Sequence, residues 1–314
     1  MINEIVKNGI IGFILGDAMG VPLEFSKRRN ADNKVIDMLE YGSHNLEKGS
    51  WSDDSSMVIA TMKSIIDNKG KIDYEDIMNN FIKWAENGEF TPNCKTFGIG
   101  RTTLRALYNY KSNNIKAINC GLDSIKDNGN GSLMRILPII YYCYYNNSND
   151  NEIYEIIKNT SSLTHSNNIS ILGCYIYTLY CIQLLKGNNK IDSYKYIKNY
   201  DYNMFDNDVL RYCKRLLKED ISKLSIDDIS SLGFVVDTLE AVIWCFLNSN
   251  SYDDSIIKAI NLGNDADTIG ALVGALSGIY YSDININWIK EIKRIDYIED
   301  IIKEFSNVLN YSNL

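Results

Sequence analysis

Apolar residues recur along this chain at spacings of three and four, which is the pattern of amphipathic helices. In the first segment, residues 2–19, the side chains of Ile5, Ile10 and Phe13 fall on one side, and Pro22 prevents the helix from continuing. A second helix is predicted by the apolar stripe that begins at Val58. The same pattern predicts further helices at 73–86, 96–109, 113–119, 133–145, 151–162, 168–185 and 235–248, short helices within 192–231, and one or two closing helices within 284–314. We therefore expect an all-α protein.

Residues 261–280 predict a helix that is buried near the centre of the fold. The apolar spacing indicates that this helix begins near Asp267, and Gly270, Gly274 and Gly278 then fall four apart on one face. A glycine inside a helix costs about 1 kcal/mol relative to alanine. Three glycines on one face therefore suggest that a neighbouring helix packs closely against it. The first predicted helix carries a similar row: Gly9, Gly12, Gly16 and Gly20.

Two clusters of oxygen-bearing side chains stand at predicted helix starts. Each cluster contains two carboxylates and one hydroxyl, and each precedes an apolar run. Helix capping explains either cluster alone, because Ser and Asp are favoured caps and carboxylates are favoured in a first turn. If the clusters face each other, they supply about six oxygen ligands, which suits a pair of hard cations such as Mg²⁺ or Mn²⁺. The clusters are Ser52, Asp53 and Asp54, and Asp265, Asp267 and Thr268.

Glu24 follows the first predicted helix and is a candidate for proton transfer. Its neighbours Leu23 and Phe25 would lower the polarity around it, although a solvated loop glutamate is the alternative. Residues 26–50 are polar and long enough to form a functional loop. We expect His44, within this loop, to lie at the surface.

A glycine- and asparagine-containing loop at residues 127–135 is a candidate anion site. Backbone N–H groups at a helix start bind anions well, although such a loop is more often a simple turn. Arg135 is either a phosphate ligand or a surface cation. His165 stands at the start of the helix predicted at 168–185, where the helix dipole favours a neutral imidazole. It could orient a ligand or fill a capping or core role.

Composition narrows the class of protein. Of the 314 residues, 45% are hydrophobic and 23% are charged, which is ordinary for a globular protein. A net charge of −8 argues against a broad nucleic-acid-binding surface. Seven cysteines without a C-x-x-C pair indicate reduced thiols and hence a cytoplasmic location. We find no signal sequence, membrane-spanning run, repeat or linker, so we expect a monomer with one domain, residues 1–314.

Six segments in this order resemble one family, the ADP-ribosylglycohydrolases. This family includes the dinitrogenase reductase-activating glycohydrolases and the ADP-ribosylserine and ADP-ribosylarginine hydrolases. The resemblance runs from residue 12 to about residue 281 and leaves two departures: Ser52 replaces the usual threonine, which keeps a hydroxyl, and Phe234 replaces a common tyrosine. The segments are 16–20 with Glu24, 51–54, 129–135, 164–165, 235–241 and 263–270.

The resemblance implies an orthogonal helical bundle with two Mg²⁺ or Mn²⁺ ions at its centre. The two acidic clusters described above would be the metal ligands, and Glu24 matches a glutamate that several members place near the scissile bond. Asp54 would be essential to catalysis as well. The residues that would bind the substrate diphosphate and ribose are Gly129, Asn130, Gly131 and Ser132 in the loop, together with His165.

The expected activity is removal of ADP-ribose from an acceptor by cleavage at ribose C1″, through an oxocarbenium-like state. Glu24 would serve as general base or general acid, and the sequence leaves both roles open. A protein arginine is the favoured acceptor, and loops 26–50 and 86–100 would form the surface that receives it. One alternative is a hydrolase of a small ADP-ribosyl or nucleoside metabolite. Another is a silent ADP-ribose-binding or structural protein, because the fold also occurs in lens crystallins.

Overall fold

The computed structural model describes residues 2–311, and within this range the regular elements are helices, joined by loops with three isolated β-bridges. The all-α prediction is confirmed. The α-helices are α1 (Ile2–Gly20), α2 (Asp53–Asp67), α3 (Tyr74–Asn87), α4 (Arg101–Asn113), α5 (Leu137–Tyr145), α6 (Asp150–Ser162), α7 (Asn168–Leu185), α8 (Lys190–Asn199), α9 (Asn207–Leu210), α10 (Lys214–Lys218), α11 (Val235–Leu247), α12 (Tyr252–Ile260), α13 (Ala266–Tyr281), α14 (Ile286–Glu291) and α15 (Ile295–Tyr311).

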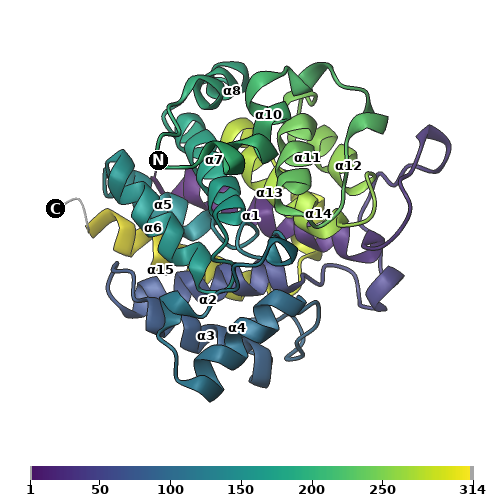
Figure 1. Ribbon diagram of the computed structural model, residues 1–314. Helices are drawn as coiled ribbons and strands as arrows, with labels where there is room; N and C mark the ends of the chain where they lie inside the picture. The colour runs from purple at the N-terminus through teal and green to yellow at the C-terminus, as the bar shows by residue number, and fades with distance from the viewer. Residues whose placement is uncertain (1, 312–314) are drawn as a thin grey trace.

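Helices α1 and α13 form the centre of the molecule and lie against each other over their whole lengths. Figure 1 shows α7, α8, α10 and α11 above this pair and α2, α3 and α4 below it. Helices α11 and α12 pack against α13, while α15 packs against both α1 and α2. The two central helices therefore carry layers on both sides, which explains why nearly every side chain of α13 is buried.

The glycine rows of α1 and α13 meet directly, as the sequence predicted. A Cβ on Gly16 would overlap the carbonyl of Gly270, and a Cβ on Gly12 would overlap the carbonyl of Gly274. The pairing order shows that the helices are antiparallel, because contacts move toward the start of α13 as they move toward the end of α1. At the end of α1, a Cβ on Gly20 would overlap the backbone of Asp267. The carboxyl end of α1 is thereby fixed beside the amino end of α13.

Several predicted helix boundaries were wrong. Residues 113–119 contain only a short 3₁₀ turn, Ala117–Asn119, because α4 ends where Asn114 takes a left-handed conformation. The helix predicted at 96–109 begins at Arg101, after Gly98 with φ of +79°. The helix predicted at 133–145 begins only at Leu137, with Pro138 in its first turn. Helix α12 was not predicted, although its capping Ser251 marks its start.

Two helical stretches reach membrane-spanning length and hydropathy, contrary to expectation: Glu4–Leu23 and Asn168–Leu185. Their residues are 78% and 94% buried inside the protein, as in core helices. All seven cysteines are free thiols, and six of them are buried, in agreement with the sequence analysis.

Candidate active site

Carboxylates from three helix ends converge at one point of the fold. Oxygen atoms of Asp17, Asp54 and Asp267 lie within 4.8 Å of one another, and so do oxygen atoms of Glu24, Asp265 and Asp267. Asp17 is on α1, Asp54 on α2 and Asp267 on α13, so the glycine contact described above helps to bring these residues together. Because Asp267 belongs to both groups, two adjacent positions for a cation would share it.

The two predicted clusters do face each other. The hydroxyl of Thr268 lies 3.2 Å from each carboxylate oxygen of Asp54, so a side chain of the second cluster donates to one of the first. Ser52 caps α2 by accepting from the N–H of Asp54, and its hydroxyl also donates to the Asp54 carboxylate. The first cluster therefore both caps α2 and forms part of the acidic centre. At the start of α13, by contrast, Asp265 makes no capping bond through its side chain.

Asp17 is the acidic residue for which the sequence analysis gave no role. It is fully buried, and its carboxylate accepts hydrogen bonds from the N–H groups of Ser52 and Ser55 at distances of 3.0–3.1 Å. The hydroxyl of Ser55 also donates to it. Asp17 thus ties α1 to the start of α2. The sequence feature that could have identified Asp17 as a site residue is a carboxylate within an otherwise apolar, glycine-rich helix.

Burial raises the pKa of every aspartate in this centre, and repulsion from neighbouring carboxylates adds to it at all of them except Asp17. Loss of hydration raises the pKa of Asp17 to about 6 and that of Asp265 to about 7, although hydrogen bonds to both carboxylates act in the opposite direction. The pKa values of Asp53, Asp54 and Asp267 are raised well above the usual range, first by burial and then by neighbouring carboxylates. Such a cluster is unfavourable as a set of anions unless a cation lies among them.

The donor set fits a hard divalent cation. Among residues 2–311 we find no lysine or arginine paired with any of the five aspartates, so the protein itself does not neutralise them. Carboxylate and hydroxyl oxygens are the ligands that Mg²⁺ and Mn²⁺ prefer. The acidic centre can therefore hold a metal ion, with Asp17, Asp54 and Asp267 as one group of donors and Glu24, Asp265 and Asp267 as the other.

Glu24 is a positioned side chain and not a solvated loop residue. It is 9% exposed, and its carboxylate is bound by the imidazole of His44, which was expected at the surface. The His44 ring lies between the rings of Phe25 and Phe97, with centroid distances of 5.9 and 5.0 Å. Leu23 is buried as expected, but Phe25 is 75% exposed at the mouth of the site and does not cover Glu24.

A cavity of about 380 Å³ lies directly beside the acidic centre, within the usual size range of small-ligand pockets. Glu24, Asp53, Asp265 and Thr268 line one part of it, and the loop at residues 129–131 lines another. Asp54 and Ser52 lie behind this surface, where both are buried. The cavity thus brings the predicted acid or base, the acidic centre and the predicted anion loop to a single space.

The anion loop has the features needed to receive a phosphate, although not from a helix start. Asn130 is fixed by bonds from its amide to Thr238 and Asp265, and its own N–H donates to Gly233. Within the described residues we find no protein acceptor for the N–H of Gly131 or of Ser132. Gly131 lines the cavity, so its N–H is available to an anion there, whereas Ser132 is fully buried and does not line the cavity, contrary to the substrate contact predicted for it. Helix α5, however, begins only after this loop, so its dipole does not act as the sequence suggested.

His165 lines the cavity beside the loop, and Arg135 lies behind the loop. His165 is buried, its Nδ1 lies 2.7 Å from the hydroxyl of Thr164, and burial followed by the charge of Arg135 lowers its pKa to about 3. It is therefore neutral. Arg135 is fully buried, which neither sequence interpretation anticipated: it donates to the carbonyls of Gly131 and Thr160, and its Nε finds no acceptor among the described residues. The loop thus lies against an unneutralised cation.

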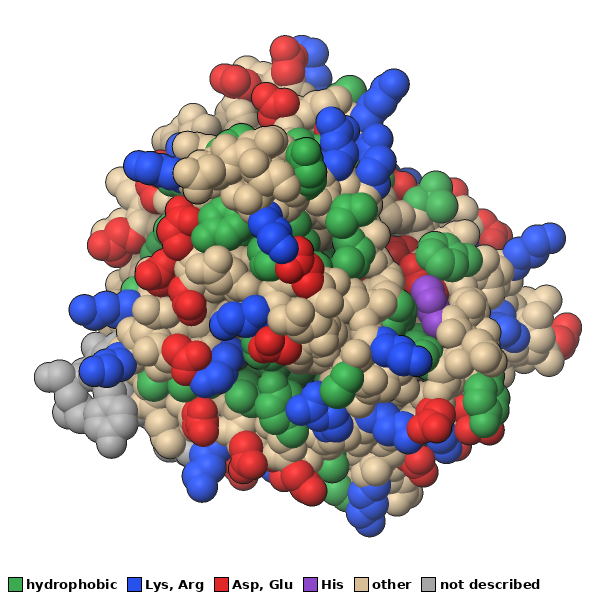
Figure 2. Space-filling model, turned by 90° about the horizontal axis from the view of Figure 1, so that it is seen from below, with side chains coloured by type: hydrophobic (Ala, Val, Ile, Leu, Met, Phe, Trp, Pro, Cys, Tyr) green, Lys and Arg blue, Asp and Glu red, His purple; other side chains and the backbone are tan. Residues whose placement is uncertain are grey.

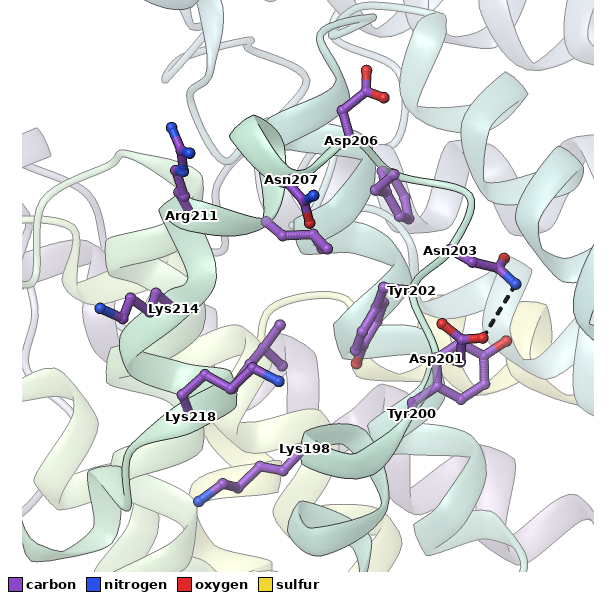
Figure 3. Close-up of a pocket in the computed structure, with 13 residues that line it drawn as sticks. Lys198, Tyr200, Asp201, Tyr202, Asn203, Asp206, Asn207, Arg211, Lys214 and Lys218 are labelled. Carbon is purple, nitrogen blue, oxygen red and sulfur yellow. Dashed lines mark hydrogen bonds between the residues drawn. The ribbon is translucent and has the colours of Figure 1, made fainter.

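A larger hollow of about 780 Å³ lies elsewhere, between α8 and the α9–α10 segment (Figure 3). Lysine and arginine side chains line one wall, and Tyr202 and Asn203 lie across from them. Its two aspartates, Asp201 and Asp206, are not part of a group of three acidic side chains such as those beside the smaller cavity. The smaller cavity is therefore the candidate active site.

Comparison with known proteins identifies the type of fold. A solved structure described as an ADP-ribosylglycohydrolase-related protein complex matches the fold with a TM-score of 0.82, at 22% identity, over 98% of this chain and 99% of that one. The protein is thus a helical bundle of the ADP-ribosylglycohydrolase type.

The chain belongs to the ADP-ribosylglycohydrolase family, whose model matches residues 2–313. It is 30% identical to an ADP-ribosylarginine hydrolase from Pseudomonas putida over 304 residues, which cover 95% of this chain and 76% of that protein. It is 23% identical to the ADP-ribosyl-[dinitrogen reductase] glycohydrolase of Rhodospirillum rubrum, over 93% and 91% of the two chains. The protein is a glycohydrolase that removes ADP-ribose from an acceptor.

Proposed function

We propose that this protein uses two divalent cations, Mg²⁺ or Mn²⁺, to cleave the C1″ glycosidic bond between ADP-ribose and an arginine side chain of a protein. The observation that carries the metal dependence is the pair of carboxylate groups that share Asp267, in which no aspartate is paired with a lysine or arginine of the described residues. The similarity to an ADP-ribosylarginine hydrolase supports arginine as the acceptor.

The acidic centre would hold the cations through Asp17, Asp54, Asp265 and Asp267, with the Thr268 hydroxyl beside them. Divalent cations bound there supply Lewis-acid chemistry, which orients the ribose hydroxyls and eases the loss of a proton from water. The hydrogen bonds from the N–H groups of Ser52 and Ser55 to Asp17 would hold the end of α1 in place while the carboxylates of the centre are deprotonated.

The cavity residues would bind and orient the substrate. The free N–H group of Gly131 would receive the diphosphate, and the buried charge of Arg135 behind the loop favours an anion there. The neutral imidazole of His165 faces the same loop, since a Cβ on Gly131 would lie 2.8 Å from its Cε1. The ribose would then lie between this loop and the carboxylates.

Glu24 would move the proton. In the hydrolysis a water oxygen bonds to C1″ while the bond from C1″ to the guanidine nitrogen breaks. One proton leaves the water and one reaches the leaving nitrogen. Glu24 lines the cavity and is held by His44, which suits a group that takes the first proton or gives the second.

The test is a panel of substrates carrying ADP-ribose on arginine, serine, cysteine, aspartate or nucleic acid, with released ADP-ribose measured by mass spectrometry. We expect release from arginine, its loss after exhaustive chelation, and its recovery when Mg²⁺ or Mn²⁺ is restored. Full activity after chelation would refute the metal dependence. Release from another acceptor alone would refute the assignment of arginine.

A further inference from the structure

A second hollow, which we name the α3–α4 groove, lies between helices α3 and α4 and has a volume of about 820 Å³. Its walls are mostly apolar, unlike the lysine- and arginine-lined hollow in Figure 3. Leu104 and Tyr108 stand one turn apart on α4 and are 55% and 62% exposed. Two large apolar side chains in this position are costly to leave in water. The groove is defined by Ile82 and Ala85 of α3, Ile99 before α4, and Leu104, Leu107 and Tyr108.

Three charged side chains also line the groove. Glu86 and Lys111 pair with each other across it, and Arg105 lies beside Leu104. Figure 2, which looks from below onto the end of the molecule that carries α3 and α4, shows patches of hydrophobic side chains separated by such charged ones. An apolar centre with a charged rim is the usual anatomy of a surface that binds a polypeptide.

The groove lies next to the active-site cavity. Ile99 lines both, and along α4 the lining changes from cavity to groove between Thr103 and Leu104. A helix rises about 1.5 Å per residue, so Tyr108 lies only roughly 8 Å along α4 from the cavity wall. A molecule bound in the cavity therefore has the near end of the groove beside it at Ile99.

We infer that the α3–α4 groove binds apolar side chains of the polypeptide that flanks the ADP-ribosylated residue. This inference rests on the proposed function and gives it a substrate class: a protein acceptor and not a small metabolite. An extended chain advances about 3.3 Å per residue, so two to four residues beyond the modified arginine reach Leu104 and Tyr108. A small ADP-ribosyl compound has no part that could reach them.

The experiment compares two substrates: an arginine-ADP-ribosylated protein and free ADP-ribosylarginine. The variant is Leu104→Ser with Tyr108→Ser, which removes the two exposed apolar side chains. The matched control is Ile191→Ser with Tyr196→Ser on α8, where the original residues are 45% and 37% exposed and far from the cavity. We expect kcat/KM on the protein to fall about tenfold in the groove variant, since truncating two interface residues commonly costs this much, and kcat/KM on ADP-ribosylarginine to stay within about twofold. The control should change neither.

Each other outcome overturns the inference. Equal loss on both substrates would mean that the groove acts on the active site and not on the acceptor. Unchanged activity on both, or a dimer that becomes a monomer without a change in substrate selectivity, would assign the groove to another role. If the wild-type protein cleaves neither substrate, the proposed function itself fails, and this result is separate from failure of the groove.

Discussion

The two carboxylate oxygens of Asp17 lie 3.0 and 3.1 Å from the backbone nitrogen of Ser52. This contact joins the end of α1 to the start of α2, and it places a fully buried carboxylate next to Asp54 and Asp267. A group that both fixes two helices and contributes an oxygen to the acidic centre should be essential to activity.

We predict that Asp17→Asn reduces kcat at least about 100-fold, because the amide keeps one acceptor for the backbone but loses the negative charge that a cation requires. Mn²⁺ affinity, measured by calorimetry, should fall in parallel. Asp76→Asn is the matched control, since Asp76 also accepts from two side chains, Ser64 and Asn68, away from the site. Wild-type Mn²⁺ affinity in the Asp17 variant would exclude Asp17 from the metal site.

We predict that the metal-free protein loses stability as pH rises from about 4 to above 7. The folded-state pKa values of Asp17 and Asp265 are raised to about 6 and about 7, so the folded state binds more protons than the unfolded state over this interval. The free energy of unfolding therefore falls with pH until these groups are deprotonated in both states. Melting temperatures at pH 5 and pH 8 in a chelator measure the effect.

The same measurement with Mg²⁺ or Mn²⁺ provides the control. Added cation should raise the melting temperature more at pH 8 than at pH 5, because carboxylates must be deprotonated to bind it. Asp267→Asn should flatten the pH dependence in chelator, since it removes a carboxyl whose pKa is raised well above the usual range. A melting temperature that rises with pH in chelator would contradict the proposed state of the acidic centre.

We predict that Glu24→Gln lowers kcat by roughly 10²–10⁴-fold, the usual loss for a proton-transfer group. Affinity for ADP-ribose should stay near wild type, because glutamine keeps the shape of the side chain and its contact with His44. Single-turnover assays and calorimetry test the two parts. If turnover falls less than about tenfold, Glu24 is not the proton-transfer group and Asp54 becomes the better candidate.

We predict that Gly131→Ala weakens ADP-ribose binding at least about tenfold. The new Cβ would lie 2.8 Å from the His165 ring, which must shift and disturb the loop that receives the diphosphate. Gly173→Ala creates a comparable clash, 2.7 Å from the Val235 side chain, outside the cavity lining. The Gly173 variant should lower the melting temperature without changing the dissociation constant. Equal dissociation constants for Gly131→Ala and wild type would place the diphosphate elsewhere.

The helices and the two acidic clusters could be found because both are short-range patterns, whereas the meeting of the clusters, 214 residues apart, was implied by the resemblance to the family. The spacing of Gly270 and Gly274 indicated a close helix contact, and the carboxylates at two helix starts indicated oxygen ligands for a cation. His44 was not predictable as a partner of Glu24, because a 20-residue separation in an irregular loop has no periodicity to reveal it. Burial of Arg135 was equally hidden, since only the packed fold shows that its charge lies behind the loop.

The contact between α1 and α13 also has a consequence for synthesis. The acidic centre needs Asp17 from the first helix and Asp267 from near the end of the chain, so a polypeptide still growing on the ribosome has no complete site until its last segments emerge. Contacts between residues so distant in sequence form late and slow folding. Until then the apolar faces of α1 and its glycine row remain open to chaperones and to proteases. A chain that terminates before α13 would consequently contain most of the protein and have no catalytic capacity.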